Sequence, residues 1–154
     1  MGDDVAVELG ADRVSAEAVV EADAGAVFEF LRRPANHVVI SGDHTVRGAM
    51  TGPEALGPGD SFGMAMRIKL PYRVTSRVVE FEQDRLIAWC HFFGHRWRWE
   101  LEPLGPGRTR VRETFDLGTA KIPAALRVIG LPAGHRGNVA KSVRNVAAHF
   151  RSDS

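Results

Sequence analysis

The fold is decided by residues 85–116, RLIAWCHFFGHRWRWELEPLGPGRTRVRETFD, where three runs of alternating character are separated by Gly94 and by a turn at residues 105–107. In the middle run, the odd positions from His95 to Leu101 are aromatic or apolar, while the even positions carry charges. Strict alternation of this kind is typical of antiparallel strands that have one covered face and one solvated face. The stretch therefore predicts three antiparallel strands with an aromatic inner face.

The charges of this stretch also predict its register. One choice of pairing across the turn at residues 105–107 sets opposite charges against each other, and a shift of two residues spoils the pattern. The pairs are Glu100 with Arg112, Glu102 with Arg110, and Arg96 with Asp116. The same register sets Trp97 opposite Phe115 and Trp99 opposite Glu113 on the inner face. Glu113 is therefore predicted to be a carboxyl group that points toward the interior.

Composition limits the class of protein. The 154 residues suit a single domain, and a formal net charge of +1 provides no unbalanced basic surface for nucleic acid. The lone Cys90 favours a reducing compartment, the first residues lack the pattern of a signal peptide, and no segment is long and apolar enough to span a membrane. We expect a cytoplasmic protein, and the sequence leaves its oligomeric state open.

The rest of the chain surrounds this stretch with further strands and helices. Residues 1–12 are predicted to be a flexible tail or a short extension of the first strand, and a single domain is expected over residues 13–151. A strand at 14–22 precedes a helix that Asp23 caps, followed by a second short helix or turn at 36–41 and by strands at 44–50, 61–70 and 72–82. After Asp116 the pattern becomes helical, with segments at 122–129 and 135–151. An α+β fold follows, in which a curved antiparallel sheet of about seven strands wraps a long C-terminal helix.

The order of the predicted elements and several stretches of sequence resemble a known family. The element order, together with VFEFLRRPANH, LGPGDSF and VVEFEQDRLIAW, is similar to the START-like SRPBCC superfamily and its helix-grip fold, especially the bacterial polyketide cyclase/dehydrase branch. The likeness covers residues 13–151. It implies a hydrophobic or aromatic ligand held between the sheet and the C-terminal helix, and catalysis in some members.

A polar row is predicted on the inner face. Continuing the register through the turn at residues 83–84, and through a three-residue loop at Gly94, aligns Arg77, His91, Trp99 and Glu113. Strand spacing would separate His91 and Glu113 by ~10 Å at the backbone. Burial would raise the pKa of an unpaired carboxyl, so Glu113 is the first candidate for a general acid or base and His91 the second. A structural hydrogen-bonded network is the alternative.

The other candidate ligand contacts are apolar or flank the last helix. They are Met64, Met66, Trp89, Trp97, Trp99, Phe115, Asn138 and Ser142. Each of the aromatic and methionine side chains is equally compatible with ordinary core packing. The glycines and proline at residues 130–134 interrupt the C-terminal helical pattern, and this break is predicted to be either a lid or a plain helix break.

Other chemistries lack the residues that they need. No HExxH, CxxC, GxGxxG or P-loop pattern occurs, and His37 and His44 have no accompanying ligand pattern, so neither a metal nor a cofactor is expected. His37 and His44 are expected to be caps, surface residues or residues at the rim of a cavity. Cys90 has outer-face parity and is a poor nucleophile candidate.

Three functions remain open. The first is a small-molecule binding protein for a hydrophobic, aromatic, lipid or polyketide-like ligand. The second is a cyclase or dehydratase that uses Glu113 and His91 as acid and base. The third is a non-catalytic interaction protein whose cavity is filled by its own side chains.

Overall fold

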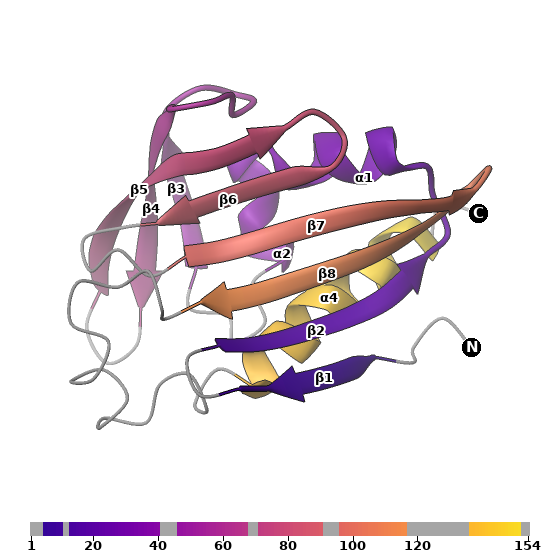
Figure 1. The fold of residues 1–154 in the computed structure, drawn as a ribbon. Helices are drawn as coiled ribbons and strands as arrows, with labels where there is room; N and C mark the ends of the chain where they lie inside the picture. Colours follow the sequence, from indigo (N-terminus) through magenta and orange to yellow (C-terminus); the bar gives the residue numbers. More distant parts are fainter. Residues whose placement is uncertain are drawn as a thin grey trace.

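One antiparallel sheet with helices on a single face forms the molecule (Figure 1). This computed structural model describes residues 5–10, 13–40, 46–67, 71–90, 96–116 and 136–151, some of them by their backbone alone. The described strands are β1 (Ala6–Leu9), β2 (Arg13–Val20), β3 (Val46–Thr51), β4 (Ser61–Arg67), β5 (Pro71–Glu82), β6 (Leu86–Cys90), β7 (Arg96–Gly105) and β8 (Arg108–Asp116). The described helices are α1 (Ala24–Leu31), the 3-10 turn η1 (Pro34–Asn36), α2 (His37–Ile40) and α4 (Arg136–Arg151).

The strand order places the N-terminal strands β1 and β2 beside β8, the last strand in the sequence of those described. The sheet runs β1-β2-β8-β7-β6-β5-β4-β3, so each strand from β3 to β8 neighbours the next one in sequence, and β2 closes against β8. The helices α1 and α2 carry the chain from β2 to β3 at the opposite edge. The last helix, α4, lies behind β2 and β8 (Figure 1). We call the helix side the inner face and the opposite side the outer face.

The predicted α+β architecture is confirmed, and so is its last helix. The sequence predicted a helix from residue 135 to 151, and α4 occupies Arg136–Arg151. Its apolar stripe is buried as the spacing indicates, with Val139, Val143 and Val146 fully inaccessible to water. The predicted segment at 122–129 and the break at 130–134 lie outside the described residues.

The expectation of a flexible N-terminal tail is wrong for Ala6–Leu9. These residues form β1, an edge strand paired in antiparallel register with β2. The sheet therefore has eight described strands where about seven were predicted. A four-residue strand is too short for its alternation to stand out in the sequence, and its pairing with β2 is what orders it.

Asp23 occupies the N-cap position of α1, as predicted, but its carboxylate serves another element. It has the extended backbone of a cap residue and makes no side-chain capping bond. Instead its Oδ1 accepts a hydrogen bond of 2.7 Å from the backbone N–H of Gly107, in the turn between β7 and β8. This contact ties the start of α1 to the tip of the β7–β8 hairpin.

The predicted register of β7 against β8 is confirmed residue by residue. Trp99 faces Glu113, Trp97 faces Phe115, and the three opposite-charge positions face each other. The ion pairs follow this register only in part. Glu102 pairs with Arg110 as expected. Arg112 contacts Glu17 of β2 and Glu8 of β1, and Glu100 contacts Arg98 of its own strand.

Arg77 does not lie on the inner face, which corrects the predicted row. A bulge at Val79 in β5 makes Val78 the partner of Trp89 and Arg77 the partner of Cys90. A bulge adds one residue to one strand and so reverses the parity of everything before it. Ser76 and Val78 are buried, whereas Arg77 is exposed on the outer face.

His91 does not pair with Trp99 either. The residue of β6 opposite Trp99 is Ile87, and Cys90 at the end of this strand faces Arg96. The register predicted through Gly94 is therefore wrong, and the loop itself, residues 91–95, lies outside the described residues. The observed register brings Trp89 opposite Trp97, an aromatic cross-strand pair that favours it.

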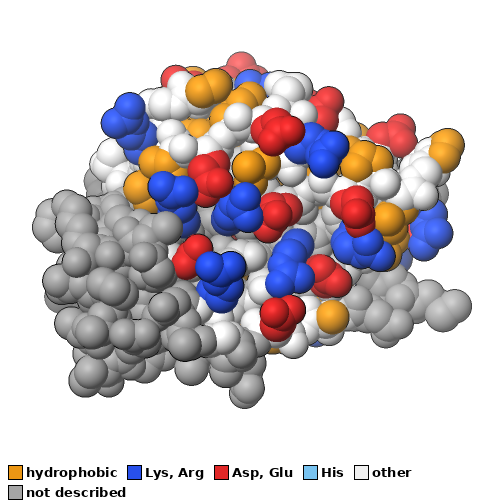
Figure 2. Space-filling model, viewed as in Figure 1, with side chains coloured by type: hydrophobic (Ala, Val, Ile, Leu, Met, Phe, Trp, Pro, Cys, Tyr) orange, Lys and Arg blue, Asp and Glu red, His pale blue; other side chains and the backbone are white. Residues whose placement is uncertain are grey.

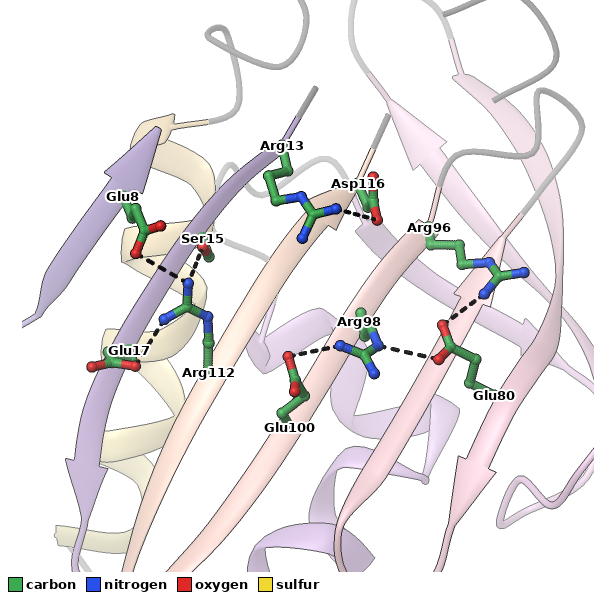
Figure 3. A network of polar contacts seen from close by, with 10 residues as sticks. All are labelled: Glu8, Arg13, Ser15, Glu17, Glu80, Arg96, Arg98, Glu100, Arg112 and Asp116. Atoms are coloured by element: carbon green, nitrogen blue, oxygen red, sulfur yellow. Dashed lines mark hydrogen bonds and ion pairs between the residues drawn. The ribbon is translucent and has the colours of Figure 1, made fainter. Parts of the chain in front are cut away.

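Ion pairs cover the outer face. Figure 2 shows acidic and basic side chains interspersed over this face. Glu80 on β5 binds Arg96 at 2.8 Å and Arg98 at 3.2 Å, both on β7, across the intervening strand β6 (Figure 3). Ala88, the residue of β6 between Glu80 and Arg98, is completely buried although it lies on the outer face.

A second group of polar contacts connects β8 to β1 and β2. The Arg112 guanidinium contacts Glu17 at 3.0 Å, Glu8 at 3.3 Å and the Ser15 hydroxyl at 2.9 Å (Figure 3). Several charges of this face are therefore compensated by side chains on other strands of the sheet.

Candidate functional site

Glu113 is a buried carboxyl group at the centre of the inner face. The strand β8 places it between Ala16 of β2 and Trp99 of β7. Its side chain is 4% exposed, and Trp99 is fully buried beside it. The predicted inward direction of Glu113 is thus confirmed. Its cross-strand neighbour on β2, Ala16, has a small side chain.

The helix α4 supplies the hydrogen-bond partner of Glu113. The hydroxyl of Ser142, itself 5% exposed, bonds to the carboxyl group. Burial raises the pKa of Glu113 well above its ordinary value, because a charge is costly away from water. The bond from Ser142 favours the charged form and opposes that rise, with the smaller effect. Glu113 therefore holds its proton to a higher pH than an exposed glutamate does.

Trp99 and Glu113 each carry a buried polar atom that has no partner in the described part of the chain. Oε1 of Glu113 and Nε1 of Trp99 have no hydrogen-bond partner among the residues that the structure describes. A buried polar group left unpaired costs about 1–3 kcal/mol. The two residues face each other across neighbouring strands, a position in which Cβ atoms lie roughly 4.5–5.5 Å apart. The two side chains therefore start from neighbouring positions on the inner face, and each carries a polar atom that could bind a ligand.

A row of aromatic side chains lies on the inner face, next to the row that contains Trp99 and Glu113. Phe115 faces Trp97, and Trp97 faces Trp89, on β8, β7 and β6. The rings of Trp97 and Phe115 have centroids 4.6 Å apart. Phe62 of β4 meets the edge of Trp89 at 5.7 Å. Trp97 stays partly exposed, while Phe115 and Phe62 are buried.

His37 completes the aromatic row from the helix side, and sequence reasoning did not place it there. It begins α2, stacks on Trp89 with ring centroids 4.7 Å apart, and is 4% exposed. Its Nε2 donates a hydrogen bond of 3.1 Å to the backbone oxygen of Leu31. Burial lowers the pKa of His37 to about 4, so the ring is neutral near physiological pH. A four-residue helix has no periodicity that could have marked this histidine as buried.

Comparison with known proteins identifies the family. The model of the family described as polyketide cyclase / dehydrase and lipid transport matches residues 11–151. The chain belongs to this family. That membership confirms the resemblance to the polyketide cyclase/dehydrase branch of the SRPBCC superfamily.

A curated relative of the chain is the uncharacterized protein Rv0088 of Mycobacterium tuberculosis. The two are 44% identical over 115 residues, which is 74% of this chain and 51% of the relative. The chain therefore spans about half the length of the curated relatives that it matches. Activities of the whole relative do not transfer to this chain on that basis.

Solved structures share the fold at low sequence identity. A protein from Arthrobacter aurescens superposes with a TM-score of 0.69 at 15% identity, covering 96% of this chain and 91% of that one. The Zhui aromatase/cyclase from Streptomyces sp. R1128 gives a TM-score of 0.66 at 18% identity, covering 90% and 93%. These likenesses confirm the helix-grip fold of the family.

The remaining candidates of the sequence fall into two groups. Ser142 touches Glu113, and the aromatic residues form the wall described above. The side chains of Met64, Met66 and Asn138, and the whole of His91, lie outside the described residues. Their part in binding stays a prediction. Within the described ranges, no three His, Cys, Asp or Glu side chains gather as metal ligands, and no helix is long and apolar enough to cross a membrane. The expected cytoplasmic location also stays a prediction.

Proposed function

We propose that this protein binds a small hydrophobic or aromatic molecule between the inner face of the sheet and α4. The observation that carries the proposal is the pair of buried atoms without partners in the described part of the chain, Oε1 of Glu113 and Nε1 of Trp99. They lie beside the row formed by Trp89, Trp97 and Phe115. An apolar wall with few polar groups is the usual character of a small-molecule site. The family description, which names polyketide cyclases and lipid transport, supports the same ligand class.

Native mass spectrometry of the purified full chain tests this proposal. The expected result is a bound compound of low molecular mass that denaturation releases. Ligand binding stabilises the folded state, so extraction of the compound should also lower the melting temperature, and adding it back should restore that temperature. A chain that carries no compound and gains no stability from lipids or polycyclic aromatic compounds would instead support the interaction protein with a filled interior.

A second candidate function is acid–base catalysis by Glu113, as in a cyclase or dehydratase. It is favoured by one observation, the raised pKa of this buried carboxyl group, which keeps a proton available for transfer. The participation of His91 remains a prediction. Glu113→Gln separates the two functions, because the amide keeps the shape of the side chain but cannot exchange the proton. If the protein is an enzyme, this variant binds the identified compound with unchanged affinity and no longer converts it.

A further inference from the structure

The two unpaired atoms differ in what they can bond to. Nε1 of Trp99 is a donor and nothing else. Oε1 of Glu113 accepts a hydrogen bond when the carboxyl group is ionised, and it can donate or accept when the group is protonated. Ser142 already bonds to the carboxyl group, and Oε1 is left without a partner in the described part of the chain. A ligand group that satisfies both atoms must accept a hydrogen bond from the indole N–H. It must also be able either to donate a hydrogen bond to the carboxyl group or to accept one from it.

From this chemistry we infer that Trp99 and Glu113 together bind one uncharged hydroxyl group, such as the phenolic hydroxyl of an aromatic or polycyclic ligand. This inference rests on the proposed function and deepens it. A hydroxyl oxygen has two lone pairs and one proton. It accepts from the Trp99 N–H, and it either donates to Oε1 or accepts from it when Glu113 carries the proton there. One ligand group thus satisfies both protein atoms in either protonation state.

A carboxylate would fit this site poorly. The described arginines of β2, β7 and β8 lie on the outer face, where most of them are paired with carboxylates. Among the described residues that are buried, the titratable side chains are Glu113 and His37, and His37 is held neutral. A second carboxylate would meet a buried carboxyl group with no buried cation among the described residues to compensate it. A methyl group, in turn, would leave both polar atoms unpaired.

Three probes of one shape test the inference on the full chain. They are 2-naphthol, 2-methylnaphthalene and 2-naphthoate, titrated calorimetrically at neutral pH. We expect 2-naphthol to bind about tenfold more tightly than 2-methylnaphthalene, because two buried groups gain partners, and 2-naphthoate to bind most weakly. Trp99→Phe should reduce the preference for naphthol to about threefold or less, while the affinity for 2-methylnaphthalene persists.

Trp97→Phe is the matched control. It removes an indole from the same strand and the same face, two residues away, without touching the pair of unpaired atoms. It should change the affinity for all probes alike and preserve the preference for naphthol. If Trp99→Phe does not fold, Glu113→Leu takes its place, since it removes the unpaired oxygen and puts an apolar side chain of similar size in the same position.

The outcomes separate the inference from the proposed function. Equal affinity for 2-naphthol and 2-methylnaphthalene overturns the hydroxyl assignment and leaves small-molecule binding intact. A preference for 2-naphthaldehyde over 2-naphthol overturns it in favour of a carbonyl ligand. If no probe binds, the co-purified compound decides, and a compound without a hydroxyl group refutes the inference. A chain that binds neither probes nor any co-purified compound loses the proposed function itself.

Discussion

At Glu113 burial and hydrogen bonding act in opposite directions on one carboxyl group. Burial disfavours the charged form, and the bond from Ser142 favours it, with burial the larger effect. A single hydrogen bond to a charged group contributes about 1.5–3 kcal/mol, whereas moving a carboxylate out of water costs several kcal/mol. The structure therefore stabilises the protonated acid at a position where an exposed glutamate would be ionised.

Glu113→Gln should make the protein more stable at neutral and alkaline pH. The folded-state pKa of Glu113 exceeds the value of 4.5 of an unperturbed glutamate, so the unfolded chain loses its proton first as the pH rises. Wild-type stability consequently falls as the pH rises from 4.5 through the folded-state pKa. Glutamine has no such titration. The free energy of unfolding by urea, measured from mildly acid to alkaline pH, should show a gap that widens with pH.

Glu82→Gln provides the control for this measurement. Glu82 lies exposed on the outer face at the end of β5, so its replacement should leave the pH profile of the wild type nearly unchanged. Parallel profiles for wild type and Glu113→Gln would contradict the raised pKa.

His37 gives the opposite dependence on pH. Its pKa is lowered from 6.5 to about 4, so the unfolded chain takes up a proton first as the pH falls. Wild type should lose up to about 3 kcal/mol of stability between pH 6.5 and about 4. His37→Phe keeps a ring against Trp89 and removes the titration, so its stability should decline less over this window. Urea unfolding at the two ends of the window measures the difference.

His149→Gln is the corresponding control. His149 stacks on Phe30 near the end of α4, with ring centroids 4.2 Å apart, but it is only half-buried. Its replacement should cost some stability at every pH without removing the acid-dependent loss. The same loss in His37→Phe as in wild type would disprove the assignment to His37.

At the scale of elements, the small side chain of Ala88 determines how the outer face is connected. Glu80 and Arg98 are both cross-strand neighbours of Ala88, and they meet above its methyl group. Cross-strand neighbours lie ~4.8 Å apart, so residues two strands apart can meet only if the residue between them is short. Side chains on β5 and β7 are thereby coupled without being adjacent.

Ala88→Leu should break this coupling. We expect Glu80→Gln to lower the free energy of unfolding by about 0.5–1 kcal/mol in the wild type, because two partly exposed ion pairs are lost. The same substitution should cost almost nothing in the Ala88→Leu background, since the leucine already separates the charges. A double-mutant cycle by urea unfolding, repeated at high salt, measures the coupling. An undiminished effect of Glu80→Gln in the Ala88→Leu background would mean that the ion pairs do not depend on the small residue.

The elements also show what sequence reasoning could reach. The register of β7 and β8 was predictable because charges on one face and aromatics on the other agree on a single pairing. The inward direction of Glu113 followed from that register. The bulge at Val79 was not predictable, because an extra residue in a strand leaves the local alternation intact and changes only the parity across it. Arg77 was therefore assigned to the wrong face.

Contacts between elements far apart in the sequence could not be predicted either, because they depend on how those elements pack together. Ser142 was one of several polar residues beside an apolar stripe, and only the placement of α4 over β8 singles it out as the partner of Glu113. His37 carried no signal of burial. The ionic partners of Arg96 and Arg112 lie on strands that a hairpin register does not include.

At the scale of the whole molecule, two buried titratable groups limit the pH range of stability from opposite sides. His37 destabilises the folded state at low pH, and Glu113 destabilises it as the pH rises above 4.5. Their printed partners differ, Trp89 and Leu31 for His37 and Trp99 and Ser142 for Glu113, so we expect their effects to add. The double variant His37→Phe/Glu113→Gln should have a flatter profile of unfolding free energy against pH than either single variant. A profile no flatter than that of the better single variant would show that the two groups are coupled.

The closure of β2 on β8 also bears on how the chain emerges from the ribosome. Arg112 on β8 bonds to Glu17 on β2, 95 residues earlier. At a synthesis rate of roughly 5–20 residues per second, β2 waits about 5–20 s for its permanent neighbour. During that time it has only the four-residue β1 beside it, and an isolated two-stranded hairpin is marginally stable in water. The nascent chain thus exposes the hydrogen-bonding edge of β2 that later pairs with β8 until β8 itself has been synthesised.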